Sequence, residues 1–481
     1  MTEWQMLRAG SRIFFVGIGG ISMSGLAEIA QADGYVVAGS DRNLNHRTQF
    51  IAARGITVRQ GHDAAWIDQF EPDLVVHTAA VHDDNPELQR SRERGITVID
   101  RARFLGWLNR SYNRVVNIAG THGKTTTTAI CALILIEAGL DPTVHLGAEL
   151  RQFHGTVRNG KNRDLMVSEA CEYMNSFLQF YSTTAAVLNI DYDHVDCFSS
   201  LDAVIEAFST FSAALPAEGL LVIPDFDPNV AAMLDRLRRS DRPMPRLATF
   251  GFDDSPPDSD RPVPTYQCRG LSYEGGLPRF EIWHDGRCRC HIRLQVPGRH
   301  NVANALAAVA CAHQNGADFA AAETVLNRYQ GAEGRFTEVG RYRGARVIAD
   351  YAHHPAAARV TLAAARLLDH RHLWVVFQPL TFSRVKVLFD DYVDALKGSE
   401  QIIFSEIYSD REKNTGEVSS RMLVERINAL GGQAWFGENF DQIRQWLDDR
   451  AGAEDVILVM GPENIRDFAD ELTGRTSHLD D

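Results

Sequence analysis

The sequence has no long hydrophobic run and no excess of positive charge. No stretch of about 18 apolar residues occurs, and the first residues show neither the basic nor the apolar region of a signal peptide. We therefore expect a cytoplasmic protein without membrane insertion. The formal net charge of −14 argues against nucleic acid as a partner, because binding a phosphate backbone requires a basic face. Local basic groups can still hold small anionic substrates.

Cysteine is scarce and scattered, and internal repeats and low-complexity stretches are missing. The seven cysteines stand at positions 131, 171, 197, 268, 288, 290 and 311. Cys288 and Cys290 form a C-x-C pair, but no second pair follows at the spacing of a zinc site. The sequence therefore predicts reduced thiols and no zinc site.

The 481 residues are too many for one hydrophobic core, so we expect three domains, at residues 1–110, 111–333 and 334–481. All three are predicted to be α/β, the first and last Rossmann-like and the middle one an ATPase-like domain with a phosphate loop. Monomer and homodimer are both open. Later strands are expected at Arg289–Val296 (antiparallel), Arg346–Asp350, His372–Phe377, Gln401–Phe404 and Asp455–Met460, and a loop at 253–264.

The most informative segment is a strand, a turn and a helix start at residues 115–128. The apolar run Val115–Ala119 leads into Gly120-Thr121-His122-Gly123-Lys124-Thr125-Thr126. Glycines let backbone N–H groups approach phosphates, a lysine adds positive charge, and a threonine hydroxyl can bind Mg²⁺. The turn is shorter than the usual GxxxxGK[ST] loop. An ordinary strand–helix turn with an exposed lysine is the alternative.

A second glycine-rich turn follows the first expected strand, Arg12–Val16. It includes Gly17, Gly19 and Gly20, and a strand at Tyr35–Gly39 then ends at Ser40-Asp41. An acidic residue at that place commonly binds ribose hydroxyls in a Rossmann-like unit. The spacing departs from GxGxxG, so nicotinamide binding does not follow. Further strands are expected at Leu74–His77 and Thr97–Ile99.

Glu169 ends the expected strand Asp164–Glu169, at the edge where open α/β sheets bind their ligands. It is a second candidate Mg²⁺ ligand beside Thr125, because phosphoryl transfer needs a metal to neutralise charge. A solvated strand end is the alternative for Glu169. We expect its strand to lie beside the phosphate-loop strand in the same sheet.

His194 follows the expected strand Ala185–Ile190, in a segment rich in aspartate. This histidine either binds a second metal ion or belongs to an N-cap cluster for a helix that begins at Leu201. The aspartates of this cluster are Asp191, Asp193 and Asp196.

Polar residues also gather in the last third of the chain. Asp350-Tyr351-Ala352-His353-His354-Pro355 puts two imidazoles after a strand end, which favours a functional site. Asn301 and Asn304 open a helix with two amides on one face, with N-capping as the alternative. Arg335 and Arg384 are isolated arginines, for which a solvated surface position is the default.

Eight motifs in this order resemble the Mur ligase family over nearly the whole chain. One alone is modest support, whereas eight in the family's order are strong support, and the family's shortened loop accounts for the missing first glycine. The motifs are Gly17–Gly25, Gly120–Thr128, Glu169–Tyr173, Asn189–His194, Gly298–Asn301, Gly334–Phe336, Asp350–Pro355 and Arg411–Gly416.

The resemblance implies an ATP-dependent ligase that joins L-alanine to the carboxylate of UDP-N-acetylmuramate through an acyl phosphate, in peptidoglycan precursor synthesis, with ATP and Mg²⁺. The UDP-sugar would be bound by Gly19, Gly20, Ser22, Met23, Ser40, Asp41, Thr78, Ala79 and Ala80. ATP would be bound by Gly120, Thr121, His122, Gly123, Lys124, Thr125, Thr126, Asn301, Arg335 and Asp350. Mg²⁺ would be bound by Thr125, Glu169 and His194. The amino acid would lie near Tyr351, His353 and Arg384, and catalytic roles are implied for Lys124, His194, His353 and Arg384.

Two departures from the family keep alternatives open. The family usually has histidine after Gln378-Pro379, where this chain has Leu380, and Gly461-Pro462-Glu463-Asn464 replaces a run of small residues. One alternative is a recycling ligase that attaches a ready-made tripeptide to the same sugar nucleotide. Another is a non-catalytic sensor that binds UDP-sugar and ATP. A nicotinamide dehydrogenase would rest on the N-terminal turn alone.

Overall fold

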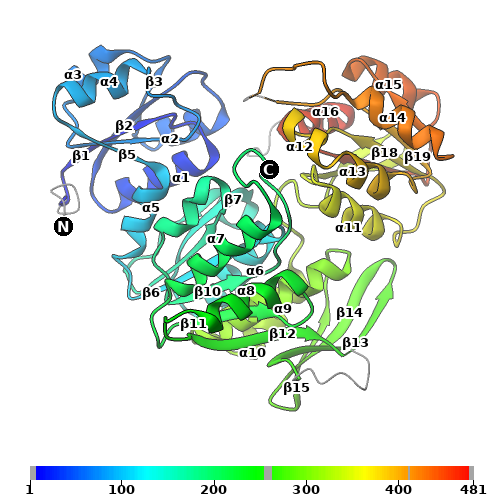
Figure 1. The fold of residues 1–481 in the computed structure, drawn as a ribbon, viewed down its shortest axis with the longest axis horizontal. Coiled ribbons are helices and arrows are strands. Elements are labelled where there is room, and N and C mark those ends of the chain that lie inside the picture. The colour runs from blue at the N-terminus through cyan, green and yellow to red at the C-terminus, as the bar shows by residue number, and fades with distance from the viewer. Residues whose placement is uncertain (1–6, 254–262, 410–411, 476–481) are drawn as a thin grey trace.

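A computed structural model describes residues 7–253, 263–409 and 412–475. The chain forms three α/β domains around sheets of five, ten and six strands, with the first and third domains standing side by side over the central one (Figure 1). The predicted fold class is confirmed. Most of the expected loop at 253–264 lies outside the described residues, as does Arg411 of the eighth motif.

The first domain is a parallel sheet in the order β3-β2-β1-β4-β5 with helices on both faces (Figure 1). From β1 the chain adds strands first toward one edge of the sheet (β2, β3) and then toward the other (β4, β5). Ligands of such sheets bind at the strand ends beside this reversal of strand order, between β1 and β4. The strands are β1 Arg12–Val16, β2 Val36–Asp41, β3 Thr57–Gln60, β4 Leu74–His77 and β5 Thr97–Asp100. The helices are α1 Ile21–Ala32, α2 His46–Ala53, α3 Ala64–Phe70, α4 Pro86–Glu93 and α5 Arg101–Asn109.

The central sheet has the order β15-β14-β13-β12-β11-β10-β6-β9-β7-β8. Its interior strand β6 carries the phosphate loop and has parallel neighbours, β9 and β10. The strands are β6 Arg114–Ala119, β7 Thr143–Leu150, β8 Gly155–Arg158, β9 Leu165–Ala170, β10 Thr184–Val187, β11 Leu220–Pro224, β12 Arg246–Phe252, β13 Tyr266–Glu274, β14 Leu277–His284 and β15 Arg287–Arg293. The helices are α6 Lys124–Glu137, α7 Leu201–Ala213, α8 Pro228–Arg239, α9 Arg299–Gln314 and α10 Phe319–Arg328, with short 3₁₀ turns at Arg151–Phe153 and Tyr173–Gln179.

Two expected strands of this sheet differ in their bounds. The strand predicted to reach Ile190 ends at Val187. Its continuation leaves the sheet because the Asn189 side chain bonds the backbone of His122, accepting from its N–H at 2.8 Å and donating to its carbonyl at 2.9 Å. The strand predicted over 289–296 is antiparallel as expected but spans Arg287–Arg293.

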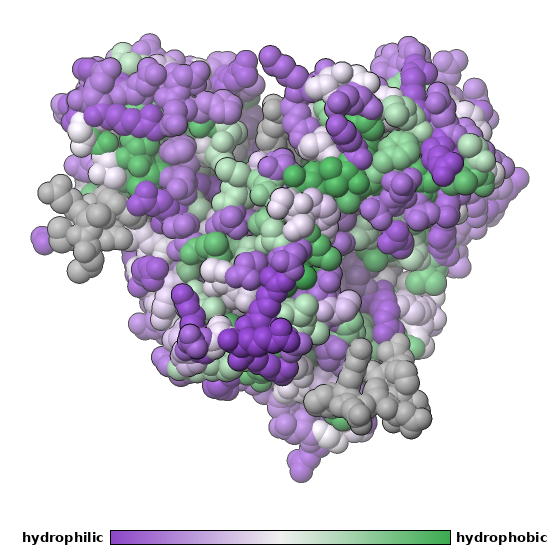
Figure 2. Space-filling view, viewed as in Figure 1, coloured by the Kyte–Doolittle hydropathy of each residue, from purple (hydrophilic) through white to green (hydrophobic). Residues whose placement is uncertain are grey.

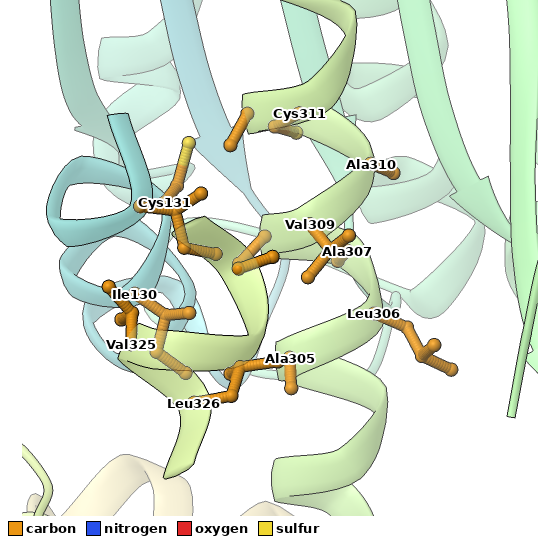
Figure 3. Close-up of a cluster of buried hydrophobic side chains, with 14 of the residues drawn as sticks. Ile130, Cys131, Ala305, Leu306, Ala307, Val309, Ala310, Cys311, Val325 and Leu326 are labelled. Carbon is orange, nitrogen blue, oxygen red and sulfur yellow. The ribbon is translucent and has the colours of Figure 1, made fainter. Parts of the chain in front are cut away.

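Three helices pack together on one face of the central sheet (Figure 3). Ile130 and Cys131 of α6 meet a run of small residues on α9, and Val325 and Leu326 of α10 close the cluster. Alanines at the contact let α6 and α9 approach closely. Full burial of a side chain such as Ile130 contributes about 1.5–3 kcal/mol, so this cluster fixes the helix that begins at the phosphate loop.

The third domain has a sheet in the order β16-β17-β21-β18-β19-β20, parallel except for the edge strand β16. All its expected strands are confirmed to within a residue. The strands are β16 Thr337–Tyr342, β17 Ala345–Asp350, β18 Leu373–Phe377, β19 Gln401–Phe404, β20 Ala434–Phe436 and β21 Val456–Met460. The helices are α11 Pro355–Ala365, α12 Phe382–Val387, α13 Phe389–Leu396, α14 Ser420–Ala429, α15 Phe440–Asp448 and α16 Glu463–Thr473.

The central and third domains are joined by a covalent link and also make contact at a second place. The link contains Gly331 and Gly334, both with positive φ (101° and 68°). The turn between β13 and β14 touches the third domain so closely that a Cβ on Gly276 would lie 2.6 Å from the carbonyl oxygen of Leu367. Glycine is therefore required at this contact.

The visible surface is mostly hydrophilic, with apolar residues in small scattered groups (Figure 2). Within the described residues, no helix is both long and apolar enough to cross a bilayer.

Candidate functional site

The phosphate loop joins β6 to α6, as predicted. Gly120 and Gly123 adopt positive φ (141° and 85°), and Gly123 is the N-cap of α6. A Cβ on Gly123 would lie 2.3 Å from Oδ1 of Asn304, so this turn packs directly on the start of α9. Thr125 and Thr126 are buried in the first turn of α6. The loop therefore places backbone N–H groups and a helix N-terminus at one point, the arrangement that binds phosphate.

Lys124 is tied into this loop rather than exposed. Its Nζ donates to the carbonyl of Gly120 at 2.5 Å and to Oε2 of Glu172 at 2.9 Å, and the Glu172 side chain is 2% exposed. Burial lowers the pKa of Lys124, but Glu172, Cys171 and Glu169 together raise it more, so the net pKa lies above its ordinary value. Lys124 is therefore a permanent positive charge at the phosphate loop, and the exposed-lysine alternative is wrong.

Thr125 and Glu169 meet across the β6–β9 pair. Glu169 lies opposite Ile118 in the parallel register, which confirms the expectation that its strand lies beside the phosphate-loop strand. The Thr125 hydroxyl donates to Oε2 of Glu169 at 3.1 Å, and the Gly147 N–H donates to Oε1 at 2.5 Å. Burial raises the pKa of the Glu169 carboxyl, a cost to its charged form that a bound cation would offset. Two hard oxygen ligands at a phosphate loop fit Mg²⁺.

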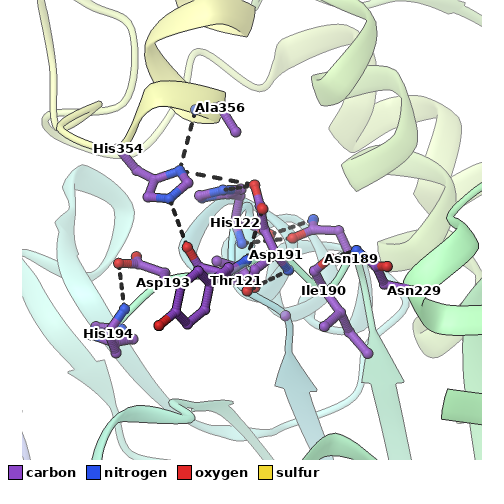
Figure 4. A network of polar contacts seen from close by, with 12 residues as sticks. Thr121, His122, Asn189, Ile190, Asp191, Asp193, His194, Asn229, His354 and Ala356 are labelled. Atoms are coloured by element: carbon purple, nitrogen blue, oxygen red, sulfur yellow. Dashed lines mark hydrogen bonds and ion pairs between the residues drawn. The ribbon is translucent and has the colours of Figure 1, made fainter. Parts of the chain in front are cut away.

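His194 lies in the loop after β10, with a positive φ of 51° (Figure 4). Its backbone N–H donates to Oδ1 of Asp193 at 2.6 Å, and its Nε2 lies 3.8 Å from Oε1 of Glu172. Helix α7 is capped by Ser200, whose hydroxyl accepts from the Ala203 N–H, so the N-cap interpretation of this cluster is wrong. Burial lowers the pKa of His194, which keeps the imidazole neutral and its lone pair available to a metal.

Arg384 joins the third domain to the central one. Its Nε donates to Oδ1 of Asp193 at 2.7 Å, and the two side chains are 4% and 8% exposed. The solvated position expected of an isolated arginine is therefore wrong. Burial raises the pKa of the Asp193 carboxyl, but Arg384 and the neighbouring histidines together lower it more, leaving that pKa well below its ordinary value. This ion pair is fully charged at neutral pH.

A second contact between these domains involves two imidazoles and a carboxylate (Figure 4). Nε2 of His122 lies 3.5 Å from Oδ2 of Asp191, and the rings of His122 and His354 are 5.0 Å apart. His354 Nδ1 accepts from the Ala356 N–H at 3.2 Å, which caps α11, while its Nε2 lies 3.2 Å from the carbonyl of Tyr192. Since the cap fixes Nδ1 as an acceptor, Nε2 carries the hydrogen and donates to Tyr192. Thr121 supports the same loop by accepting from the Asp191 N–H at 2.8 Å.

His353 and Tyr351 lie beside this junction. His353 Nδ1 is 2.8 Å from the carbonyl of Tyr351, and the hydroxyl of Tyr392 donates to the carbonyl of His353 at 2.7 Å. Burial holds the pKa of His353 well below its ordinary value. The Arg335 guanidinium lies 4.8 Å from the centre of the Tyr351 ring.

Asp350 and Asn301 are held by backbone groups. The Asp350 carboxylate accepts from the Phe336 N–H at 2.7 Å and the Ala352 N–H at 2.8 Å. The Asn301 amide donates to the carbonyl of Pro297 at 2.8 Å and accepts from the Asn304 amide at 3.2 Å. The N-cap of α9 is Gly298 without a side-chain bond, so the N-capping interpretation of the two amides is wrong.

The first-domain residues gather at the end of β1, apart from the phosphate loop. Oδ2 of Asp41 accepts from the Gly19 N–H at 2.8 Å, beside Gly20 at the start of α1. A Cβ on Gly17 would lie 2.5 Å from Cγ2 of Thr78. Ala79 and Ala80 form an exposed turn after β4, whereas the side chains of Met23 and Ser40 are buried.

Ser22 connects the first domain to the central one. Its hydroxyl lies 3.1 Å from Nε2 of His145 and accepts from Arg101 at 3.0 Å. Burial lowers the pKa of His145 to about 4, so this contact involves a neutral imidazole. The turn predicted to bind the UDP-sugar is thereby tied to strand β7 of the central sheet.

The sequence predicts no role for Glu172, and it names Asp193 and His354 only as members of a cluster around His194 and of a pair of imidazoles. Each lies within three residues of a predicted site residue, and each follows a strand end. In the structure they bond Lys124, Arg384 and Tyr192, respectively. A charged or titratable residue just beyond a strand end was the signal that could have identified them.

The buried histidines make stability depend on pH. Burial lowers the pKa of His354 to about 4, from an ordinary value of 6.5. The unfolded chain therefore binds more protons than the folded one between these values, and stability should fall as pH drops from about 6.5 to 4. His354 alone accounts for about 3 kcal/mol of this loss. We expect a His354→Asn variant, which keeps a good N-cap, to lose less stability on acidification in thermal unfolding.

The exposed His372 provides the control for this prediction. A His372→Asn variant should follow the parent protein at every pH. Equal acid sensitivity of His354→Asn and the parent would show that His354 does not titrate with unfolding.

Three family descriptions match the chain in order along its length. "Mur ligase family, catalytic domain" matches residues 12–113, "Mur ligase middle domain" residues 118–312, and "Mur ligase, glutamate ligase domain" residues 334–462. A UDP-N-acetylmuramate–L-alanine ligase of Caldanaerobacter subterraneus subsp. tengcongensis is 38% identical over 96% of this chain and 97% of its own length.

Solved structures agree with these matches. A UDP-N-acetylmuramate–alanine ligase of Thermotoga maritima superposes with a TM-score of 0.78 at 28% identity, covering 96% of this chain and 98% of that one. A murein peptide ligase of Psychrobacter arcticus shares the fold, with a TM-score of 0.71 at 24% identity, covering 98% and 100%. By sequence and by fold, the chain belongs to the Mur ligase family.

Proposed function

We propose that this protein is an ATP-dependent ligase that joins L-alanine to the carboxylate of UDP-N-acetylmuramate, a step of peptidoglycan precursor synthesis. One observation carries the proposal: hydrogen bonds, together with a 3.8 Å polar contact between Glu172 and His194, connect the charged lysine of the phosphate loop to the arginine of the third domain. The names of relatives at 38% identity supply the substrates. ATP use agrees with a Mur ligase that was solved with ADP. A nucleotide sugar and ATP are both cytoplasmic metabolites, which favours that compartment.

The first step of the reaction brings together two anions, the sugar carboxylate and the triphosphate of ATP. A carboxylate oxygen of the sugar attacks the γ-phosphorus of ATP, and ADP leaves with the electrons of the broken bond. The neutral amine of alanine then attacks the acyl carbon, phosphate leaves with the electrons of the broken C–O bond, and the nitrogen gives up a proton to solvent as the amide forms. Lys124 lowers the repulsion of the first step by holding positive charge at the phosphate loop, in a site partly shielded from water.

We propose that Thr125 and Glu169 bind one Mg²⁺ and His194 a second. When bound, Mg²⁺ would neutralise charge on the phosphate oxygens. Gly120, Thr121, His122, Gly123 and Thr126 would line the phosphates, and Asn301, Arg335 and Asp350 would contact the rest of the nucleotide.

We further propose three functional domains, at residues 1–110, 111–333 and 334–481. The first would bind the UDP-sugar through Gly19, Gly20, Ser22, Met23, Ser40, Asp41, Thr78, Ala79 and Ala80. The Gly19–Asp41 hydrogen bond supports this, because it brings the turn and the acidic residue to one strand edge. The third would hold the amino acid near Tyr351, His353 and Arg384.

A tripeptide ligase is the second candidate function, because Leu380 stands where the family usually has histidine. Leu380 is 7% exposed and pairs with Tyr408 beside Arg384, to which its carbonyl is bonded at 3.3 Å. An apolar residue here changes the lining of the acceptor pocket.

An assay of phosphate release separates these functions. It contains UDP-N-acetylmuramate, ATP and one acceptor at a time. We expect release with L-alanine, less with glycine or L-serine, and none with the tripeptide L-alanyl-γ-D-glutamyl-meso-diaminopimelate. Release with the tripeptide alone would identify the recycling ligase. No release with any acceptor, with nucleotide binding intact, would identify a sensor.

A Glu169→Gln variant tests the metal site separately. The amide keeps the shape of the side chain but removes its charge, so we expect the Mg²⁺ concentration for half-maximal activity to rise about 10- to 100-fold. Excess Mg²⁺ should recover part of kcat. An unchanged Mg²⁺ dependence would exclude Glu169 as a ligand. Glu149→Gln provides a control carboxylate, which pairs with His46 of the first domain instead of with Thr125.

A further inference from the structure

The antiparallel strands β14 and β15 bring three metal-binding side chains onto one face of the sheet. Glu281 of β14 lies directly opposite His291 of β15, so both side chains point the same way. The register then shifts, because Ile282 pairs with Cys290 and the next residue, Trp283, pairs with Cys288. Figure 1 shows β15 at the lower end of the central domain, away from the first and third domains.

The shift makes Arg289 the extra residue of a β-bulge. In a regular strand, residues three apart point to opposite faces. The bulge changes this alternation, so Cys288 and His291 share a face with Glu281, while Cys290 points into the core. The C-x-C spacing alone predicts no metal site. The set of three potential ligands is complete only because the bulge turns Cys288 to this face and the partner strand supplies Glu281.

The distances suit one small cation. Sγ of Cys288 lies 3.7 Å from Nε2 of His291, and Nδ1 of His291 lies 3.5 Å from Oε1 of Glu281. One potential ligand atom from each side chain lies within 4.8 Å of the other two. Tetrahedral zinc with ordinary bond lengths separates its ligand atoms by roughly 3.3–3.6 Å. In the structure, Nε2 of His291 faces Cys288 and Nδ1 faces Glu281, whereas a single ion binds only one of these nitrogens. Rotation of the ring would direct one nitrogen to the ion, and the side chain has room to rotate because it is 74% exposed.

Neighbouring groups fix the Glu281 carboxylate and the backbone of His291. The Trp283 indole donates to Oε2 of Glu281 at 2.8 Å, which leaves Oε1 toward His291. The backbone N–H of His291 donates to Glu323 of α10 at 3.0 Å. A ligand carboxylate that is itself fixed by a hydrogen bond is typical of metal sites.

We propose that Cys288, His291 and Glu281 form a surface site for a zinc-type divalent cation, with water as the fourth ligand. A thiolate, an imidazole and a carboxylate are the ligands that Zn²⁺ and Co²⁺ accept and that Mg²⁺ does not. On binding, the Cys288 thiol releases its proton to solvent and its sulfur bonds the metal. Such an ion would clasp β14 to β15, far from the phosphate loop.

Cobalt titration of the chelator-treated full-length protein, under anaerobic conditions and without ATP, tests the site. A sulfur–cobalt bond gives a near-ultraviolet charge-transfer band that oxygen and nitrogen ligands do not. We expect this band to saturate at one equivalent of Co²⁺ and to disappear when Zn²⁺ is added. Its absence in the native protein would overturn the proposal.

Variants assign the band to these residues. Cys288→Ser should abolish it, and His291→Ala, at an exposed position that folding tolerates, should weaken Co²⁺ binding about 100-fold or more. Cys290→Ala is the matched control, two residues away on the opposite face, and should keep the band. A band that survives in Cys288→Ser, or that is lost in Cys290→Ala while the fold persists, would contradict the proposed ligand set.

Discussion

A Lys124→Met variant should lose about 10³-fold in kcat while still binding UDP-N-acetylmuramate. Methionine keeps the length and apolar stem of lysine but removes the positive charge from the phosphate loop. The charge is needed where the sugar carboxylate approaches ATP, and no other lysine or arginine hydrogen-bonds the Gly120 carbonyl in the described part of the chain. Phosphate release and sugar-nucleotide binding, measured separately, check this expectation.

The same substitution leaves Glu172 buried without its cation. Losing one partner of a buried pair costs about 3–5 kcal/mol, so reduced activity alone could reflect a weakened fold. The double variant Lys124→Met/Glu172→Gln removes both charges and should regain most of the thermal stability. It should not regain activity. A double variant that turns over at the parental rate would refute the role of Lys124.

An Asp193→Asn variant should lower the free energy of unfolding by about 3 kcal/mol or more. The substitution leaves Arg384 buried at the domain junction without a carboxylate, since both side chains are less than a tenth exposed. Activity should fall as well, because Arg384 then loses its fixed position beside the proposed amino-acid site. Denaturant unfolding followed by tryptophan fluorescence, together with small-angle scattering, measures stability and domain docking.

A double-mutant cycle isolates this pair. Arg384→Met combined with Asp193→Asn should be more stable than Asp193→Asn alone, because the uncompensated charge is gone. The exposed pair Lys386–Glu417, at 3.0 Å on the same domain, is the control. Lys386→Met should cost about 1 kcal/mol at most. Equal losses at the two pairs would show that burial of the Asp193–Arg384 pair is unimportant.

The arrangement of strands and helices follows largely from local patterns. The run Val115–Ala119 forms a strand because β-branched residues fit a sheet covered on both faces, and the glycines after it supply the positive φ that the phosphate loop requires. The placement of Glu169 beside this strand was also predictable, because strands of such sheets share one ligand-binding edge.

The contacts that complete the site depend on long-range packing and could not be read from local sequence. Arg384 and Asp193 are 191 positions apart, and only the docking of two domains makes them partners. The same holds for His354 and Tyr192. The interpretation of the aspartates before α7 as a helix cap failed for a local reason, since Ser200 stands immediately before the helix and caps it instead.

The Gly276 turn has a mechanical consequence. It meets Leu367 at one place, whereas the Asp193–Arg384 ion pair and the His354–Tyr192 contact hold the third domain at another. A swing of the third domain about the glycines at 331 and 334 would have to break the contacts at both places. Release of the product by such a movement would then cost the interactions at both places.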